Sequence, residues 1–212
     1  MNKKYELTDE TLRIDGRILH RIRSSQNFGN VKAGDLGGFI ESEDNLSQDG
    51  NCWVFGNAQV YGNAQVFDDA WISDNARVFG NSQVYGDTQV YGDTLVSGIA
   101  QVFDNALVSG IAQVYGDARV YGNARVSGTA QVYGDANISS DDDYITIGNI
   151  GSRHDTTTAF KCSDNTIKVK CGCFTGTLNE FHDKVIKTHK DNKYAKVYLS
   201  VIETVKVYFD LT

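Results

Sequence analysis

A six-residue pattern that repeats fifteen times without an insertion constrains the fold of this 212-residue chain more than any other feature. The repeats run over residues 51–140, and NAQVYG at 57–62 is the clearest copy. The fourth position is Val or Ile in every copy, and the second position is always a small residue. Because alternate residues of an extended segment share a face, the second and fourth positions are expected to point inward, and the third and fifth outward.

The sixth position of one copy and the first position of the next are expected to form a tight corner. The sixth is usually Gly and the first usually Asn or Asp, residues that accept a left-handed backbone. Where Asp replaces the Gly, at Asp68, Asp74 and Asp104, another Asp or an Asn follows. One residue that tolerates positive φ is therefore expected at each corner. Equal corners make the chain coil, and three strands, or eighteen residues, close a triangular turn.

This pattern resembles the hexapeptide-repeat family of left-handed parallel β-helices, in which an inward aliphatic residue alternates with an inward small one. The resemblance covers residues 51–140 and implies a mainly β protein with five eighteen-residue coils. Coils about 4.8 Å apart would form a prism roughly 24 Å tall. The left-handed sense comes from the resemblance alone, because parallel connections are usually right-handed.

Residues 1–50 are predicted to be an N-terminal hairpin and capping segment, since an open β-helix end exposes unpaired backbone. Asp15-Gly16 predicts a two-residue turn within a hairpin over residues 12–23. Residues 31–50 are expected to form an irregular first coil. Trp53 and Trp71 should be buried beneath this cap.

Residues 141–212 are predicted to form a small α+β module. Strand-like runs cover 144–147, 156–161 and 166–171, and a capping box at residues 177–180 should open a helix that ends near His189. A second helix is expected over residues 193–209, where apolar residues recur at helical spacing. The segments GSRHDTTTAF (151–160), KVKCGCFTGTLNEF (168–181) and THKDNKYAKVYL (188–199) are similar to a module appended to such repeats in phage and prophage proteins. The resemblance implies no particular activity.

Charge is unevenly distributed over this chain of net charge −7. The repeats hold eight acidic and three basic residues, which makes nucleic acid an unfavourable ligand. No secretory signal or membrane-length apolar stretch is evident, so a cytoplasmic protein without membrane contact is expected, in the host cytoplasm if phage-encoded. The four cysteines do not suggest a disulfide framework, and reduced thiols are expected.

Residues eighteen apart should stack in columns on the outer faces. One face carries an aromatic column beside a mainly glutamine column, and both are candidate interface residues. The aromatic column is Phe67, Tyr85, Phe103 and Tyr121, and the column beside it is Gln65, Gln83, Gln101 and Arg119. A continuous aromatic strip is large for an exposed surface, so a second copy, the C-terminal helices or a protein partner is expected to cover it. The family resemblance makes a trimer the first expectation for self-association.

Many hexapeptide-family members are acyltransferases that use a histidine base, and a carbonic-anhydrase branch binds metal through three histidines. All four histidines of this chain (His20, His154, His182 and His189) lie outside the repeats. The protein is therefore predicted not to be an enzyme and to use no cofactor.

The C-terminal module offers candidate ligand-binding residues at Arg153, His154, Asp155 and Thr156, where a guanidinium and hydroxyl groups could bind an anion. A zinc site of Cys162, Cys171 and Cys173 with His154 is a weaker alternative, because the spacing matches no strong motif. Structural thiols and no metal are the favoured reading.

These observations predict a non-catalytic phage or prophage accessory scaffold that binds a protein partner, with inhibition of a host defence factor as its purpose. An alternative is sequestration of a small, nucleotide-like anion by the C-terminal module. A degenerate hexapeptide acyltransferase is the third hypothesis.

Overall fold

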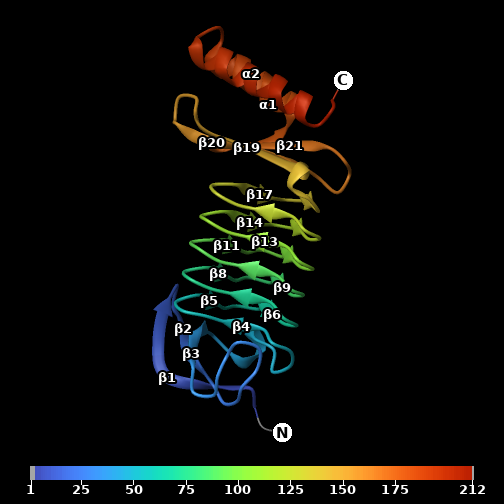
Figure 1. Cartoon of the computed structure of the whole chain (residues 1–212). Helices are drawn as coiled ribbons and strands as arrows, with labels where there is room; N and C mark the ends of the chain where they lie inside the picture. The colour runs from blue at the N-terminus through green and yellow to red at the C-terminus, as the bar shows by residue number, and fades with distance from the viewer. Residues whose placement is uncertain (1–2, 212) are drawn as a thin grey trace.

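The computed structural model describes residues 3–211. A prism of stacked coils forms the middle of the molecule, with a β-hairpin at the N-terminal end and two helices at the C-terminal end (Figure 1). The N-terminal hairpin and the C-terminal helices therefore lie at opposite ends of the prism. No helix in this part of the chain is both long and apolar enough to cross a bilayer.

The prism is a parallel β-helix with three sheets, and each hexad contributes one short strand. The first sheet includes β5 (Gln59–Val60), β8 (Arg77–Val78), β11 (Leu95–Val96), β14 (Gln113–Tyr115) and β17 (Gln131–Tyr133). The second contains β4 (Trp53–Val54), β7 (Trp71–Ile72), β10 (Gln89–Val90), β13 (Leu107–Val108) and β16 (Arg125–Val126). The third contains β6 (Gln65–Val66), β9 (Gln83–Val84), β12 (Gln101–Val102), β15 (Arg119–Val120) and β18 (Asn137–Ile138). Paired residues are eighteen apart, as Gln83 and Gln101 are, which confirms the predicted coil length.

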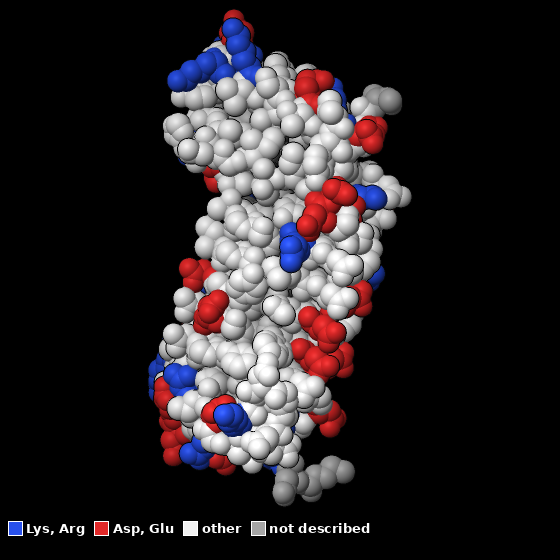
Figure 2. All heavy atoms as spheres, viewed as in Figure 1, with Lys and Arg blue, Asp and Glu red and all other residues white. Residues whose placement is uncertain are grey.

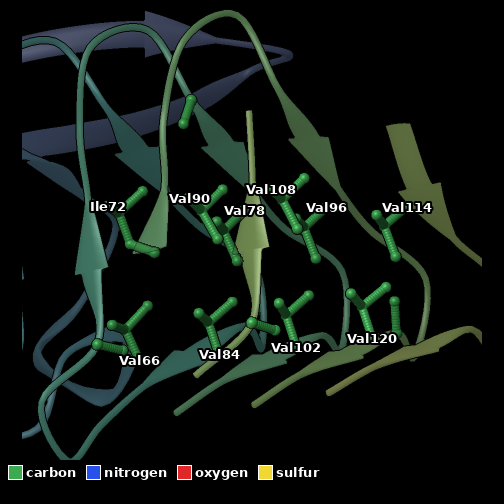
Figure 3. Packing of buried hydrophobic residues seen from close by; sticks show 14 of the residues in the cluster. Val66, Ile72, Val78, Val84, Val90, Val96, Val102, Val108, Val114 and Val120 are labelled. Atoms are coloured by element: carbon green, nitrogen blue, oxygen red, sulfur yellow. The ribbon is translucent and has the colours of Figure 1, made fainter. Parts of the chain in front are cut away.

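Aliphatic side chains from the three sheets meet inside the prism. In Figure 3 the rows that contain Val84, Val90 and Val96 point toward one another. Each of these side chains is fully buried, and so are the small residues two positions earlier. Burying one such aliphatic side chain contributes about 1.5–3 kcal/mol, so the stacked coils share a continuous stabilising core. The predicted inward positions are confirmed.

The corners place the left-handed residue at the sixth position of the hexad. Asp68, Asp74 and Asp104 themselves have φ near +57° to +60°, and the Asp or Asn that follows each does not have positive φ. In each of the three, the carboxylate accepts a hydrogen bond from a backbone N–H one coil further on, which stabilises the left-handed conformation. Asp74, for example, accepts a hydrogen bond of 2.9 Å from the N–H of Gly92, the sixth residue one coil further on. Asp at this position thus ties two coils together as well as turning the chain.

The N-terminal segment adds one more coil than the repeats alone predict. β1 (Tyr5–Ile14) and β2 (Arg17–Ser24) form the expected antiparallel hairpin, and β3 (Leu36–Ile40) follows it. β3 pairs in parallel with β5, and Leu46, just after the short 3-10 helix η1 (Glu43–Asn45), bridges to Val66. The β-helix therefore has about six turns rather than five.

The cap buries Trp53 but not Trp71. Trp53 is 1% exposed and meets the rings of Tyr5 and Phe28 edge to face. Trp71 is half-buried and packs on Phe55 with ring centroids 5.4 Å apart. The expectation for Trp71 was wrong because it lies one coil further along the prism, where the cap gives less cover.

The C-terminal module begins with the 3-10 helix η2 (Asp141–Asp143) and four antiparallel strands. These are β19 (Tyr144–Ile150), β20 (Asp155–Lys161), β21 (Ile167–Cys171) and β22 (Phe174–Thr177). β22 was not predicted, because a four-residue strand with two threonines and a glycine has little apolar pattern. The helices α1 (Leu178–His189) and α2 (Lys193–Tyr208) match the prediction closely, and the capping box of Thr177 and Glu180 is formed.

Strand β20 closes the second open end of the β-helix. Phe160 and Cys162 belong to the same buried cluster as the repeat valines, and Tyr133 meets the Phe160 ring at 5.3 Å. Lys168 forms an ion pair of 2.6 Å with Asp135 of the last coil. This end of the module therefore extends the core of the prism, whereas the rest of its sheet and its two helices pack around a separate buried cluster that includes Val169, Phe181 and Ile202.

Candidate functional site

The predicted aromatic column lies on the face of the sheet that contains β6, β9, β12 and β15. Its four rings stack nearly parallel along the prism, with centroid separations of 4.7 Å between Phe67 and Tyr85, 5.0 Å between Tyr85 and Phe103, and 5.1 Å between Phe103 and Tyr121. All four rings are half-buried, since each covers the faces of its neighbours. The column therefore presents ring edges, rather than ring faces, to the outside.

The glutamine column beside it is ordered by side-chain hydrogen bonds. The amide of Gln83 donates to Gln65 at 3.3 Å, and the amide of Gln101 donates to Gln83 at 3.2 Å. Arg119 is the backbone partner of Gln101 on the adjacent strand of the same sheet, one coil further on. The structure thus brings all eight predicted interface residues onto one flat face. The helices α1 and α2 lie beyond the end of the prism and do not cover this face (Figure 1).

A shallow hollow lies at the edge of this face. Its lining residues are Asn81, Gln83, Ile99, Gln101, Asp117 and Arg119. Ile99 is 52% exposed, although it is a branched apolar residue. On the side of the molecule seen in Figure 2, uncharged atoms cover most of the prism and acidic groups lie in patches over it. The hollow itself combines the apolar side chain of Ile99, the amides of Gln83 and Gln101, and the carboxylate of Asp117.

A second aromatic column, on the neighbouring sheet, begins with Tyr61 and Phe79, and its first ring is covered by the N-terminal segment. These rings stack at 5.0 Å, but Tyr61 is only 3% exposed, because Leu19 of the N-terminal hairpin and Phe39 pack against it. The first ring of this column, Tyr61, therefore packs against the N-terminal cap and is not available to a partner.

The four candidate ligand residues of the C-terminal module separate in space. Arg153 and Asp155 line a cavity of about 180 Å³ in the module. His154, with φ of +51°, occupies the turn between β19 and β20 and is not among the lining residues. The hydroxyl of Thr156 lies 2.6 Å from that of Thr129 in the last coil, so Thr156 attaches the module to the prism. Of the four predicted ligand residues, Arg153 and Asp155 therefore lie at the cavity, and His154 and Thr156 do not.

Sequence reasoning missed most of the other residues that line this cavity. The remaining lining residues are Ser152, Cys171, Gly172, Cys173, Phe174, Phe181, Lys184, Val185, Thr188, His189 and Tyr198. They come from the β19–β20 turn, the β21–β22 turn and both helices. No local motif links these segments, so only their convergence in the fold shows the site.

The cysteines do not assemble into the zinc site considered as an alternative. Among residues 3–211, the group of metal-ligating type that comes together is Asp135, Cys162 and Asp164. The Lys168 ammonium lies 2.6 Å from the Asp135 carboxylate, so a positive charge is already present there. Burial, reinforced by the Asp135 charge, raises the pKa of the Cys162 thiol to about 12. The cluster is therefore an ion pair between Lys168 and Asp135 beside a buried thiol, and it includes none of His154, Cys171 and Cys173.

The outer surface of α2 is the most exposed apolar region of the module. Val207 is 77% exposed, and Val197, Tyr208 and Leu211 are each 39% exposed. A shallow groove on this surface is lined by Leu199, Ser200, Glu203, Thr204, Val207 and Tyr208.

Comparison with known proteins places the similarity in the repeats. A model of the YdcK beta solenoid repeat matches residues 58–73, 70–86 and 112–128. The chain is a repeat β-helix protein. It is also 36% identical over 61 residues to a protein of Escherichia coli (strain K12) described as uncharacterized acetyltransferase YdcK. That alignment covers 25% of this chain, which spans only 19% of the length of the relative. The phage origin predicted for the chain stays a prediction.

Proposed function

We propose that the protein is a non-catalytic scaffold that binds a protein partner through the flat face formed by β6, β9, β12 and β15. The observation that carries the proposal is the pair of unbroken columns, one of stacked rings and one of hydrogen-bonded amides, which run side by side along that face. Tyr side chains are enriched at protein interfaces.

Rigidity of this face favours binding. A side chain that loses rotamer freedom at an interface costs about 0.5–1.5 kcal/mol. The stacked rings and linked glutamines are already ordered, so little of that cost remains. The hollow with exposed Ile99 gives an apolar contact point on the same surface.

Charge indicates the kind of partner. Exposed carboxylates of Asp68, Asp87 and Asp104 follow one edge of the face, and Asp117 lies at the other. Arg119 is the basic member of the predicted columns. A partner with a basic surface is therefore favoured, and its binding should weaken as salt screens these charges. Occlusion of a host defence factor remains the biological purpose we propose for such binding.

A pulldown from host lysate tests this function with matched variants. The double variant Gln83→Arg with Gln101→Arg adds two positive charges to the face, whereas Gln113→Arg adds one on a different sheet. A stoichiometric partner should be retained by the wild type and by Gln113→Arg, and lost at least tenfold with the double variant. Retention by all three proteins, or no stoichiometric partner at all, would argue against the proposal.

We also propose self-association, with a second copy covering the apolar outer surface of α2. Val207, Tyr208 and Leu211 are exposed together near the end of α2, and a trimer is the state that the family resemblance favours. Light scattering at micromolar concentration should give the mass of three chains. The Val207→Asp variant should dissociate while it keeps its circular dichroism, since Val207 contributes little to the core. A monomeric wild type would contradict this proposal.

Acetyl transfer is the second candidate function, and the description of the Escherichia coli relative favours it. The alignment reaches only 19% of that protein, and residues 51–140 of this chain contain no histidine. Turnover of acetyl-CoA by the purified protein would establish catalysis and replace the scaffold proposal.

A further inference from the structure

We propose that the cavity between the β21–β22 turn and α1 binds a small carboxylate with a flat apolar body, about the size of benzoate. This site is independent of the scaffold face. The argument rests on the charge of the cavity rim, the composition of its floor, its volume and the way in which Arg153 is positioned.

Basic side chains dominate the rim. Arg153 from the β19–β20 turn and Lys184 from α1 both line the cavity, and His189 lies at the end of the same helix. Neither Arg153 nor Lys184 forms an ion pair with any residue in the described part of the chain. The acidic lining residue, Asp155, accepts a hydrogen bond of 2.7 Å from the N–H of Thr156. The rim therefore carries the two cations Arg153 and Lys184 and the one carboxylate Asp155, and in a chain of net charge −7 this local excess of positive charge favours an anion.

Aromatic rings form the floor. Phe181 is 3% exposed and packs on Phe174 at 5.1 Å and on Tyr198 at 5.7 Å. His189 lies over Tyr198 at 5.5 Å. Small-molecule sites in proteins combine apolar walls with a few placed polar groups. Here the apolar walls fit a flat hydrocarbon body, while the cations at the rim fit a carboxylate.

Volume restricts the ligand further. The cavity holds about 180 Å³, whereas drug-sized ligands occupy sites of roughly 300–1,000 Å³. A whole nucleotide is too large to be enclosed, so the ligand we propose is smaller than the nucleotide-like anion considered as an alternative in the sequence analysis.

Two glycines allow Arg153 to reach the cavity. A Cβ on Gly172, which has φ of +54°, would lie 3.2 Å from an Arg153 guanidinium nitrogen. A Cβ on Gly151 would lie 1.8 Å from the Tyr198 hydroxyl, so only glycine lets the β19–β20 turn cross that ring. The two glycines thus leave room for the Arg153 guanidinium at the cavity and for the turn beside the Tyr198 ring.

Calorimetric titration of the full chain with benzoate tests the site, with benzamide as the neutral analogue of the same shape. We expect benzoate to bind at least tenfold more tightly than benzamide. Arg153→Gln and Lys184→Gln should each weaken benzoate binding by tenfold or more, whereas Lys187→Gln should leave it unchanged, because Lys187 lies on the same helix away from the cavity. Equal binding of the two compounds, an unchanged Arg153→Gln variant, or no benzoate binding would overturn the proposal.

The Cys173 thiol provides an independent measurement that does not depend on heat. Cys173 is exposed at the cavity, whereas Cys52 and Cys162 are buried. Cys171 also lines the cavity but is half-buried, and its sulfur accepts a hydrogen bond from the Thr157 hydroxyl. Saturating benzoate should slow the reaction of Cys173 with a chromogenic disulfide reagent several-fold in the wild type and not in Thr188→Trp, whose indole would fill the cavity mouth. An unchanged reaction rate in the wild type would also overturn the proposal. Because neither experiment uses the β6–β9–β12–β15 face, its outcome is separate from that of the scaffold test.

Discussion

The ammonium nitrogen of Lys4 lies 3.3 Å from the sulfur of Cys52 at the N-terminal end of the β-helix. Lys4 is only 2% exposed and donates to the carbonyl oxygens of Asp49, Gly50 and Cys52 at 3.1, 3.4 and 3.2 Å. Its charge also lies 5.1 Å from the centre of the Phe28 ring. A buried cation is stable here because several acceptors replace its hydration. Lys4 therefore satisfies carbonyl groups that the first coil would otherwise leave without partners.

Replacing Lys4 with Met should destabilise the protein by about 1–3 kcal/mol, the range for buried polar groups that lose their partner. The apolar side chain of Met fills similar space, so the decrease in unfolding free energy measures the cost of leaving these carbonyl groups without hydrogen bonds. Urea unfolding gives the difference in free energy. Lys3→Met is the control, because the Lys3–Glu43 pair is exposed and such pairs contribute about 0–1 kcal/mol. Equal effects of the two substitutions would contradict the role given to Lys4.

Enlarging a small inward residue should strain the prism. Ala118 is fully buried within the core of repeat valines, so Ala118→Val is expected to cost about 1–3 kcal/mol through overpacking. Gln113→Val places the same side chain on the outside and should change stability by less than about 0.5 kcal/mol. Thermal unfolding distinguishes the two. A neutral Ala118→Val variant would show that the interior has unfilled space.

Asp143 should stabilise the last coil at neutral pH but not in acid. Its carboxylate accepts hydrogen bonds from the N–H and hydroxyl of Ser139, at 2.8 and 2.6 Å, and from the N–H of Ser140 at 3.1 Å. Burial raises the pKa of Asp143, but these bonds outweigh it and the pKa falls below 3.8. A lowered folded pKa means that the stabilisation is present above pH 3.8 and is lost as pH falls through the folded value. Asp143→Ala should therefore cost about 1–3 kcal/mol at pH 7 and progressively less below pH 3.8. A cost independent of pH would contradict this.

Cys162 should make the protein sensitive to alkali. Burial and the Asp135 charge raise the pKa of its thiol from 9.0 to about 12. Because the folded pKa is higher than the unfolded one, the contribution is complete below pH 9 and declines as pH rises toward 12. Cys162→Ala should flatten the decline in unfolding free energy between pH 8 and pH 11. Cys173→Ala, which removes an exposed thiol, should leave the decline unchanged, and equal curves for wild type and Cys162→Ala would refute the assignment.

The repeats were predictable because their structure depends on contacts with the next coil only. A residue such as Val84 meets its counterparts eighteen residues away, so a fixed period predicts burial, strand position and the outer columns together. The capping box of Thr177 and Glu180 was predictable because its two partners are only three residues apart, a spacing that the sequence shows directly. The sequence did not decide which of Asp68 and Asp69 adopts the left-handed backbone, because aspartate tolerates it at either position; in the structure it is Asp68, whose carboxylate accepts a hydrogen bond from the N–H of Gly86.

The sequence by itself determined the coil: an eighteen-residue turn follows from alternating inward residues and evenly spaced corners. Only the tertiary structure decided how the prism ends and where a ligand could bind. Lys4 and Phe160 each close an end of the prism from outside the repeats, and the module cavity joins Arg153, Gly172 and Lys184 from three separate segments. These arrangements depend on packing between distant parts of the chain, which leaves no period in the sequence.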